Sequence, residues 1–499
     1  MNDWGGKAVA GGPAEPPDGP VPLTRRRYAR AVFLGALGIL LVCLAAPYTD
    51  LTLMGSELAG NHLPLGAVVF LFVLVGLAAL GRRYLPRWSG IASSELLVAF
   101  AMVLVAAGLP TFGLAAYLFP AMSAPLYYAT PENRYGEVLV ANLPKWLLPQ
   151  DPAAIRAFYL GLPPGAPLPW GAWVGPLAAW TLLALTVYLV VLSLSVLVAD
   201  QWIRRERLSY PLMQLPVEVA TQRRWHWSDA RFWMGAAIPL ALHTLNGLHE
   251  AIPEVPHVTL KNVSFLDLSP DKPLSYLRAS INVYFSVIAI AYLLPAEVSF
   301  SVWFFYFVNK LQFVAAYLRG ADLTFPGVAE AQYVGAFVAY VAIGVWVARP
   351  HWREVWQKAC AHRDASGRSY RWALAGVALG TVGMVAWLRA AGVSTGAAAA
   401  VALLFLVTCL GLGRLVVETG ALFAKATQMR PLTAFEYMAG TAWLKPSEIP
   451  VVGVVQYVFM YDLKTFVMPA AAHAQKLADA AGIRRGGFIG ALGAALLLG

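Results

Sequence analysis

Charged residues are scarce in this chain, and their scarcity decides its class. Asp, Glu, Lys and Arg make up 13% of its 499 residues, whereas a soluble globular protein carries roughly 25%. Hydrophobic residues account for 59%, and the mean hydropathy is +0.60. So few charges exclude an ordinary soluble enzyme or binding domain. The composition predicts an all-α, polytopic integral membrane protein that has the lipid bilayer as a partner.

Cysteine is almost absent, and the motifs of nucleotide chemistry are missing. Cys43, Cys360 and Cys409 lie too far apart for a CxxC site and give no disulfide framework. No Walker loop, HExxH, GxSxG or Gly-rich dinucleotide motif occurs in a suitable context. We therefore expect no cofactor, no metal–thiolate centre and no ATP-binding domain that could energise transport.

Acidic residues are fewer than basic ones, 27 against 37, which gives a net charge of +10. In a soluble protein this excess would suggest nucleic acid, but here the basic residues flank apolar runs, so no nucleic-acid partner is expected. Alternate connections hold 19 Lys and Arg, at 25–30, 81–88, 200–231 and 349–371, and the opposite connections hold 7. The positive-inside rule therefore places the N-terminus in the cytoplasm, with the chain in the cell (inner) membrane.

Long apolar runs set the expected number of spans. Each is near the ~20 residues that a helix needs to cross a bilayer. The runs lie at about 29–47, 63–80, 93–109, 172–199, 231–248, 279–296, 299–318, 328–348, 372–389 and 395–417. We expect about ten full transmembrane helices and a truncated eleventh in the final run, FIGALGAALLLG. Residues 1–28 are predicted to be a disordered cytoplasmic tail, and 29–499 a single transmembrane domain whose C-terminal span is incomplete.

Three segments are apolar but too short or too broken to cross. Residues 111–130 follow a span that ends outside and precede one that starts outside, and prolines interrupt them. The cytoplasmic segments 204–220 and 418–463 have the same character. Non-helical backbone at membrane depth is tolerated only when protein buries it or when it lines a cavity. We predict re-entrant segments, with 204–220 and 418–445 meeting to line a cavity, and an amphipathic surface helix at 464–485.

One basic residue stands inside an apolar run. Lys310 lies mid-span beside Asn309, with Gln312 close by. A basic side chain near the bilayer centre costs about 2.5–3.5 kcal/mol on insertion scales, so it normally faces a partner or a water-filled path. Lys310 therefore either lines a path or extends its ammonium to the membrane surface.

Other charged residues lie near the ends of spans. Arg414 and Glu418 are four apart, so they can pair on one helix face as a structural clasp. Solvated carboxylates are expected at span ends, at Glu95, Glu297, Glu330, Glu436 and Asp462.

The densest polar cluster is HTLNGLHEAIPEVPH at 243–257. Its residues His243, His249 and Glu250 are ligand types for zinc or iron. The two histidines are six apart, and Pro253 breaks the helix after them. These residues are weak candidates, and no metal site is predicted.

Three stretches carry a resemblance to known membrane proteins: RRERLSYPLMQLPVE at 204–218, AYLLPAEVSFSVWFFYFVNKLQ at 291–312 and GRLVVETGALFAK at 413–425. Glu206–Pro211 is similar to the charged–Leu–x–aromatic–Pro element of oligopeptide transporters. The chain as a whole resembles an uncharacterised family of bacterial and archaeal multi-pass proteins that is distantly similar to those transporters. Leu212, Met213 and Gln214 replace the small-residue pair expected after the proline, and the terminal spans of longer relatives are missing.

The resemblance, taken with the charged positions above, implies a solute or ion pathway. Its predicted residues are Glu206, Tyr210, Pro211, Glu218, Asn309, Lys310, Arg414, Glu418 and Lys425. The expected function is a secondary transporter of a small organic solute, peptide-like or metal-chelate-like by resemblance, with or without coupling to an ion. The alternatives are an integral membrane enzyme acting on a lipid-linked substrate and a non-catalytic membrane subunit. The sequence sets no oligomeric state.

Overall fold

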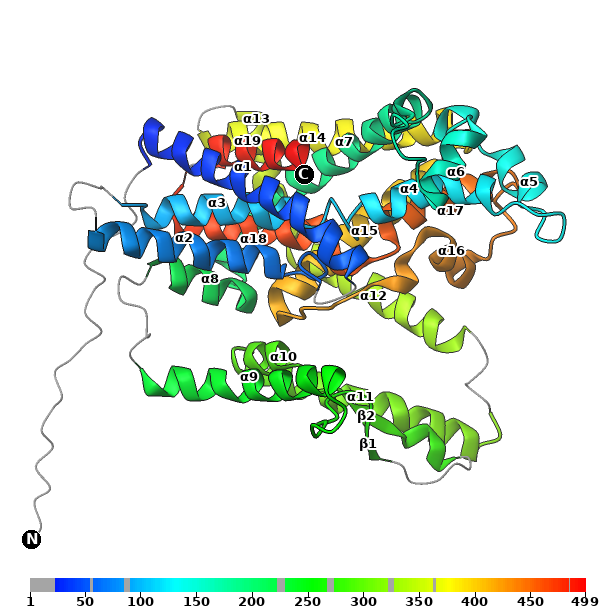
Figure 1. Ribbon diagram of the computed structural model, residues 1–499. Coiled ribbons are helices and arrows are strands. Elements are labelled where there is room, and N and C mark those ends of the chain that lie inside the picture. Colours follow the sequence, from blue (N-terminus) through cyan, green and yellow to red (C-terminus); the bar gives the residue numbers. More distant parts are fainter. Residues whose placement is uncertain are drawn as a thin grey trace, which may run out of the picture.

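The computed structural model describes residues 23–53, 57–84, 90–221, 229–266, 273–321, 327–361, 365–483 and 485–499. Within these ranges the chain forms nineteen α-helices and one two-stranded sheet, so the all-α class is confirmed (Figure 1). Most of the expected N-terminal tail, residues 1–22, lies outside the described residues.

Seven helical spans are long and apolar enough to cross a membrane, or eight when one bent pair counts as a single span. They are Arg25–Thr52, Leu65–Tyr84, Trp170–Arg205, Ala296–Leu318, Val328–Val347, Gly367–Ala390, Thr395–Thr419 and the pair Glu448–Met460 with Leu463–Ala480. The chain is therefore a multi-pass membrane protein. These counts refer to the part of the chain given above.

The predicted count of ten full spans is wrong for three of its segments. Helix α3, Ser93–Ala106, has 14 residues, which reach about 21 Å and fall short of a ~30 Å hydrocarbon core. Residues 279–296 divide into strand β2, Ala279–Ile281, and the eight-residue helix α10, Phe285–Tyr292. Helix α9, Ala230–Ala251, is long enough to cross a membrane, but its sequence is too polar for a transmembrane span. The last helix, α19, Arg485–Leu498, is another short apolar helix.

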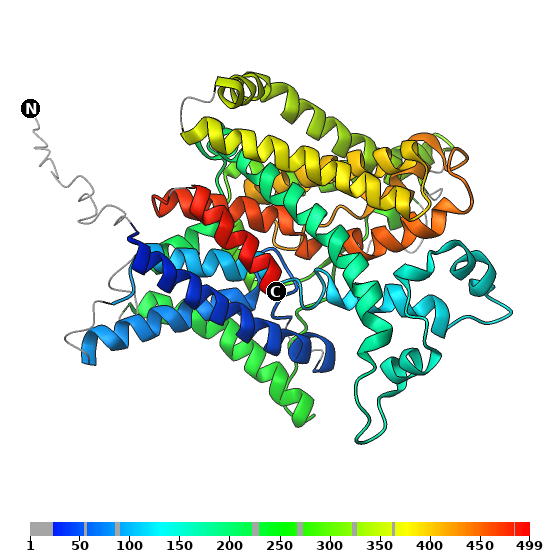
Figure 2. The same ribbon diagram turned by 90° about the horizontal axis from the view of Figure 1, so that it is seen from above.

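The core of the bundle consists of four helices: α3, α7 (Trp170–Asp200), α15 (Thr395–Thr419) and α18 (Val467–Ala480). Thirteen residues of α3 are buried, because this helix is apolar on every side. Helices α1 (Arg25–Pro47), α2 (Leu65–Tyr84) and α19 cover α3, as the view from above shows (Figure 2).

Helix α14, Ala365–Ala390, packs along α7 on the opposite side of the core. Glycines make this close contact possible. A Cβ atom at Gly380 would lie 2.8 Å from the backbone oxygen of Thr186 on α7. Any side chain at this position would therefore force the two helices apart.

The prediction of an amphipathic surface helix at 464–485 is wrong, because α18 is buried against α3, α7 and α15. Six of its fourteen residues are alanine, which lowers its apparent hydrophobicity but lets neighbouring backbones approach closely. Helix α17, Glu448–Met460, precedes it at an angle of 49°. Together they form one broken helix.

A second broken helix consists of α3 and α4, Ala115–Tyr127, with turns at 107–114 between them. The chain also breaks after α15, where Gly420 takes φ 60°, and restarts as α16, Pro431–Ala439. Short helices α5, Tyr135–Val138, and α6, Pro152–Leu160, follow α4.

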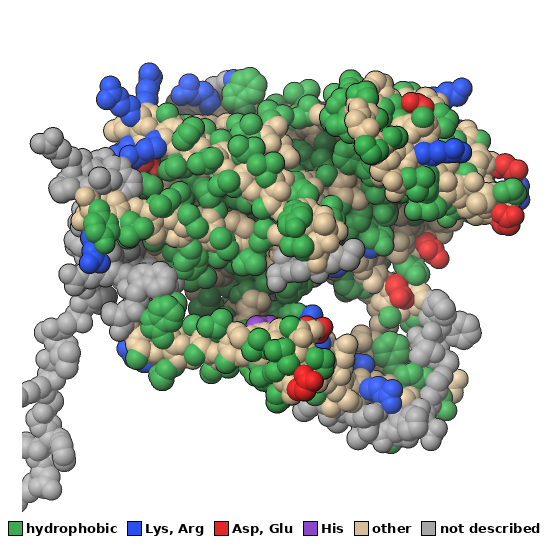
Figure 3. Space-filling view, viewed as in Figure 1, with side chains coloured by type: hydrophobic (Ala, Val, Ile, Leu, Met, Phe, Trp, Pro, Cys, Tyr) green, Lys and Arg blue, Asp and Glu red, His purple; other side chains and the backbone are tan. Residues whose placement is uncertain are grey.

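The remaining helices connect the core to a peripheral layer. Helix α8, Pro211–Thr221, packs on the core, and α12, Val328–Val347, and α13, Arg349–Ala361, continue towards α14. The peripheral layer comprises α9, β1, β2, α10 and α11, with β1 at Val263–Leu266 and α11 at Ala296–Leu318. Its strands pair antiparallel. None of its three helices has a buried residue among those described, and Figure 3 shows an opening between part of this layer and the bundle. The layer contacts the bundle near Gly420, where Ile290 of α10 and the Tyr284 ring approach Gly420 and Phe423.

Candidate functional site

Four segments that lie between α-helices meet inside the bundle, at 57–64, 107–114, 420–430 and 461–466. A Cβ atom at Gly108 would lie 3.3 Å from Cβ of Thr465, so the breaks of the two broken helices touch. The loop before α2 joins them, because the His62 backbone N–H donates to the Leu422 carbonyl at 3.2 Å. The His62 ring nitrogen Nε2 lies 3.0 Å from the Ala424 carbonyl. We call the polar side chains gathered here, Glu57, His62, Tyr117, Lys425, Asp462 and Lys464, the central crossing.

Asp462 is the most enclosed charge of the central crossing, with 7% of its side chain exposed. The Lys425 ammonium lies 3.3 Å from Oδ1 and that of Lys464 3.5 Å from Oδ2. Lys464 also pairs with Glu57 at 2.6 Å, and its ammonium lies 4.9 Å from the centre of the Phe112 ring. Two lysines and two carboxylates therefore balance, which is what burial of charge requires.

An aromatic pair separates the central crossing from a large open groove. The groove has a volume of about 770 Å³ and runs between α4 and α17, with Pro120, Pro450 and Tyr457 among its lining residues. The Tyr457 ring meets the Tyr117 ring edge-on at 5.3 Å. The Tyr117 hydroxyl in turn donates to Asp462 Oδ2 at 3.4 Å. Two rings, those of Tyr457 and Tyr117, therefore lie between this groove and the buried carboxylate.

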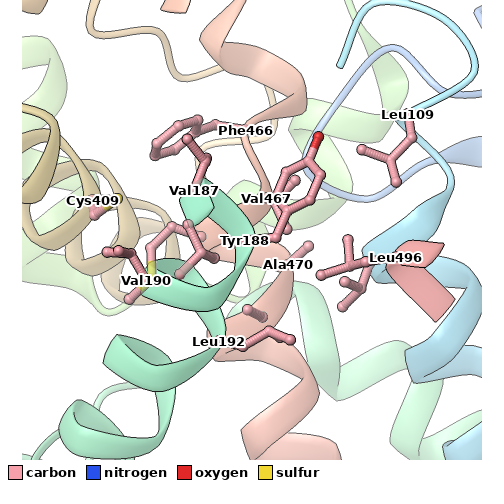
Figure 4. Close-up of a cluster of buried hydrophobic side chains, with 14 of the residues drawn as sticks. Leu109, Val187, Tyr188, Val190, Leu192, Cys409, Phe466, Val467, Ala470 and Leu496 are labelled. Atoms are coloured by element: carbon pink, nitrogen blue, oxygen red, sulfur yellow. The ribbon is translucent and has the colours of Figure 1, made fainter. Parts of the chain in front are cut away.

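Two small cavities lie on other sides of the crossing. One, of about 20 Å³, is lined by Tyr188, Asp462 and Phe466 among others, and a second, of about 10 Å³, by His62 and Thr465. Each has the space for about one water molecule. Figure 4 shows Tyr188 of α7 beside Phe466 and Val467, the residue before α18 and its first residue. The Tyr188 hydroxyl is buried and makes no hydrogen bond within the described structure.

A second charged cluster lies where the end of α7 meets α15. Arg414 pairs with Glu206 at 2.7 Å and with Glu418 at 3.5 Å, and the Tyr340 hydroxyl donates to Glu418 at 3.0 Å. The predicted Arg414–Glu418 pair is therefore confirmed, and Glu206 is an additional partner. A cavity of about 30 Å³ adjoins it, lined by Gln201, Tyr340 and Arg414 among others.

The predicted approach of 204–220 to 418–445 is confirmed. The Tyr210 backbone N–H donates to the Val417 carbonyl at 3.0 Å, and the Ser209 hydroxyl donates to the Glu418 carbonyl at 2.8 Å. Pro211 begins α8 against Gly420. Arg207 and Tyr210 both take positive φ, 53° and 46°, which is costly for residues with a side chain. The residues of 204–220 do not line the adjoining 30 Å³ cavity, whose α7 wall comes from Val198, Gln201 and Trp202.

The segment that ends α7 contacts four helices through successive side chains. Asp200 accepts a hydrogen bond from Tyr370 of α14, and Arg204 pairs with Asp479 of α18 at 3.0 Å. The next two residues continue the series, since Arg205 pairs with Glu354 of α13 and Glu206 with Arg414 of α15.

The other predicted pathway residues lie apart from both clusters. Lys310 belongs to the peripheral layer, where its ammonium donates to the Arg278 carbonyl at 2.9 Å and lies 5.5 Å from the Tyr306 ring. Asn309 is exposed, and Gln312 donates to Gln332 of α12 at 3.1 Å. Glu218 is exposed on α8. Of the nine predicted residues, Lys425 alone belongs to the central crossing.

The weak metal candidates do not converge on one ion. His249 uses Nδ1 for a 2.6 Å hydrogen bond with the Val255 carbonyl, and its ring lies 5.3 Å from that of His257. His243 packs against Phe285. In the described ranges no three His, Cys, Asp or Glu side chains are arranged to hold a metal.

Sequence reasoning missed most of the central crossing. Asp462 was expected to be solvated, as was Glu95, yet Glu95 is fully buried and pairs with Arg30 at 2.7 Å. The available signal was the pair of charges in YDLKT, which interrupts an apolar stretch at 461–465. Glu57 and His62 gave no local signal, because their partners are hundreds of residues away.

Comparison with known proteins identifies a family for the chain but no activity. A family model described as "Family of unknown function (DUF6785)" matches residues 22–499. Neither the curated proteins nor the solved structures contain a match.

Proposed function

The chain belongs to DUF6785, a family of unknown function, and we propose that it is a secondary transporter of a small organic solute. In this proposal the solute enters from the groove between α4 and α17 and reaches the central crossing. In this proposal the protein is a multi-pass protein of the cell (inner) membrane. The alternation of basic connections that favoured a cytoplasmic N-terminus does not carry over, because it assumed ten spans and the described residues hold seven or eight.

The observation that carries the proposal is the meeting of two broken helices at a buried carboxylate. Transporters bind solutes and coupling ions where discontinuous helices expose backbone groups near the middle of the membrane. The breaks at 107–114 and 461–466 touch at Gly108 and Thr465, and Asp462 lies in the second break. An ionisable residue at such a position is costly, so its presence points to a function.

The arrangement also supports coupling to a proton gradient. Asp462 is held between Lys425 and Lys464, so its protonation would weaken two ion pairs at once and loosen the contact between the breaks. Proton binding and helix movement would then be linked through one side chain. The peptide-like or chelate-like class of solute follows from the resemblance to oligopeptide transporters alone.

Uptake into vesicles tests the proposal directly. Purified protein in vesicles of phosphatidylethanolamine and phosphatidylglycerol would receive mixed di- and tripeptides and ferric chelates under an inward proton gradient, with uptake read by mass spectrometry. Wild-type protein should accumulate at least one of these solutes. Asp462→Asn should reduce accumulation at least about tenfold, because it removes the charge that the two lysines share.

Glu137→Gln is the matched control, since Glu137 is an exposed carboxylate paired with Arg134 in the connection after α4. It should transport like the wild type. Equal uptake by Asp462→Asn and wild type would remove Asp462 from the mechanism. A folded wild-type protein that accumulates none of the solutes would reject these two solute classes.

A further inference from the structure

Helix α18 carries a histidine that is completely enclosed yet lacks hydrogen-bond partners. His473 is 0% exposed, and within the described structure neither of its ring nitrogens makes a hydrogen bond. The Tyr210 hydroxyl also makes no hydrogen bond within the described structure, and Tyr210 is 1% exposed. The two rings lie 5.9 Å apart and meet edge-on. Oε1 of Gln475, also on α18, is a third buried acceptor without a partner.

Such groups are rare in folded proteins, because an unmade hydrogen bond in the interior leaves the desolvation cost of the group uncompensated. Buried polar groups without protein partners are usually bonded to ordered water. A neutral imidazole always offers one donor and one acceptor, so His473 presents both to its surroundings. Tyr210 offers the same pair of functions through one oxygen.

These side chains lie between the two charged clusters. On one side lies His62, on the same loop as Glu57, which pairs with Lys464 in the central crossing. A cavity of about 10 Å³ lined by His62 and Ala470 lies one helical turn before His473 on α18. That volume holds about one water.

On the other side, the Tyr210 backbone N–H bonds to Val417 of α15, about one helical turn after Arg414, the partner of Glu206. The Lys476 ammonium lies 5.7 Å from the Tyr210 ring, and Asp479 pairs with Arg204 at the end of α7. The ionisable groups around His473 and Tyr210 therefore come from the loop before α2, the end of α7 and α18 itself. They form a series from Asp462 to the carboxylates Glu206 and Asp479.

We propose that ordered water bonds to His473 and Tyr210 and makes them a proton path between Asp462 and the Glu206–Asp479 end of the bundle. His473 accepts a proton at one ring nitrogen and releases one from the other, which leaves the neutral ring in its other tautomer. Proton exchange with the bound water or a flip of the ring restores the first tautomer before the next transfer. Tyr210 passes a proton in the same way through its hydroxyl. The path rests on the proposed transporter function for its purpose, while the water site stands on the unpartnered atoms alone.

Hydroxyl-radical footprinting tests the water site without any solute. Radicals generated from bound water modify the side chains that touch it, and mass spectrometry of the solubilised wild-type protein locates them. Tyr210 and His473 should be modified at least about tenfold faster than Phe100 and Met102, which are equally enclosed in the apolar helix α3.

Two variants sharpen the result. His473→Leu removes the hydrogen-bonding groups and should reduce modification of Tyr210 to the level of Phe100. His473→Gln keeps a donor and an acceptor and should preserve it, which separates loss of water from loss of folding. Modification of Tyr210 no faster than that of Phe100 in the wild type would overturn the water site and the path together.

The path itself is tested in the uptake vesicles with the same peptides and ferric chelates. His473→Leu should lose proton-driven accumulation at least about tenfold while retaining exchange of labelled for unlabelled solute, which needs no net proton movement. His351→Gln is the control, because His351 is also buried but bonds to the Leu197 carbonyl at 2.7 Å. Unchanged accumulation by His473→Leu would overturn the path. Absence of uptake by the wild type would instead count against the transporter, with footprinting still deciding the water site.

Discussion

Two lysines lie in largely apolar parts of the chain: Lys464 in the central crossing and Lys310 in the peripheral layer. Lys464 is 12% exposed and contacts two carboxylates, those of Glu57 and Asp462. Lys310 lies on a helix with no buried residue and donates to a backbone carbonyl. The comparison shows that the burial of a charged side chain and its ion-pair partners decide how much it contributes to stability. Its position in an apolar run of the sequence does not.

The largest loss of stability is expected from removing Lys464, and removal of Lys310 is the comparison. Lys464→Met leaves two carboxylates short of a partner, and breaking a buried ion pair in this way costs about 3–5 kcal/mol. Lys310→Met removes one hydrogen bond at a half-exposed site and should cost less than about 1 kcal/mol. Thermal unfolding in detergent, followed by tryptophan fluorescence, measures both. Equal losses of stability would contradict the distinction between the two regions.

Two glycines extend the comparison to the backbone. Gly420 and Gly320 both take positive φ, 60° and 76°. A Cβ at Gly420 would lie 3.0 Å from Pro211, whereas one at Gly320, after α11, would meet nothing within 4 Å. Gly320→Ala should therefore cost only the left-handed strain, about 1–2 kcal/mol, and Gly420→Ala clearly more. The same thermal unfolding assay measures both variants. If Gly320→Ala is as unstable as Gly420→Ala, the close contact between position 420 and Pro211 does not determine the stability.

The smallest effect on stability is expected from Glu354, at the exposed edge of the bundle. Lys358 and Arg205 hold the pKa of Glu354 below its usual range. Glu354 therefore contributes stability above its unfolded pKa of about 4.3, and this contribution is lost as the pH falls through the lower folded value. The carboxylate is partly exposed, so the contribution is a few tenths of a kcal/mol. Between pH 7 and pH 3 the wild type should lose more stability than Glu354→Gln, by this small amount, since the other carboxylates titrate equally in both proteins.

The sequence could locate the helices that are uniformly apolar and of ordinary length. The runs at 29–47, 63–80, 172–199 and 395–417 all correspond to long helices, and the spacing of Arg414 and Glu418 predicted their pair. These features depend on residues within a few turns of one another, which local patterns describe.

The central crossing could not be predicted in the same way. It joins Glu57 to Lys464 and Tyr117 to Asp462 across more than 300 residues, and no local pattern encodes that meeting. The buried helix α18 was mistaken for a surface helix because alanine contributes little hydrophobicity although it packs closely. Its boundary was also misplaced, since Lys464 stands just before the helix and not on its polar face.

The central crossing holds equal numbers of positive and negative side chains, and this has an electrical consequence. A carrier whose empty site is neutral moves no net charge when it reorients, so the membrane voltage neither drives nor resists that step. Each elementary charge that crosses the whole field is worth about 2.3 kcal/mol per 100 mV. If the chain is the transporter proposed above, voltage would act only on the loaded protein, through the charge that the solute and a coupling proton bring. Charge movement recorded from vesicles on a solid-supported membrane should therefore be absent until solute is added.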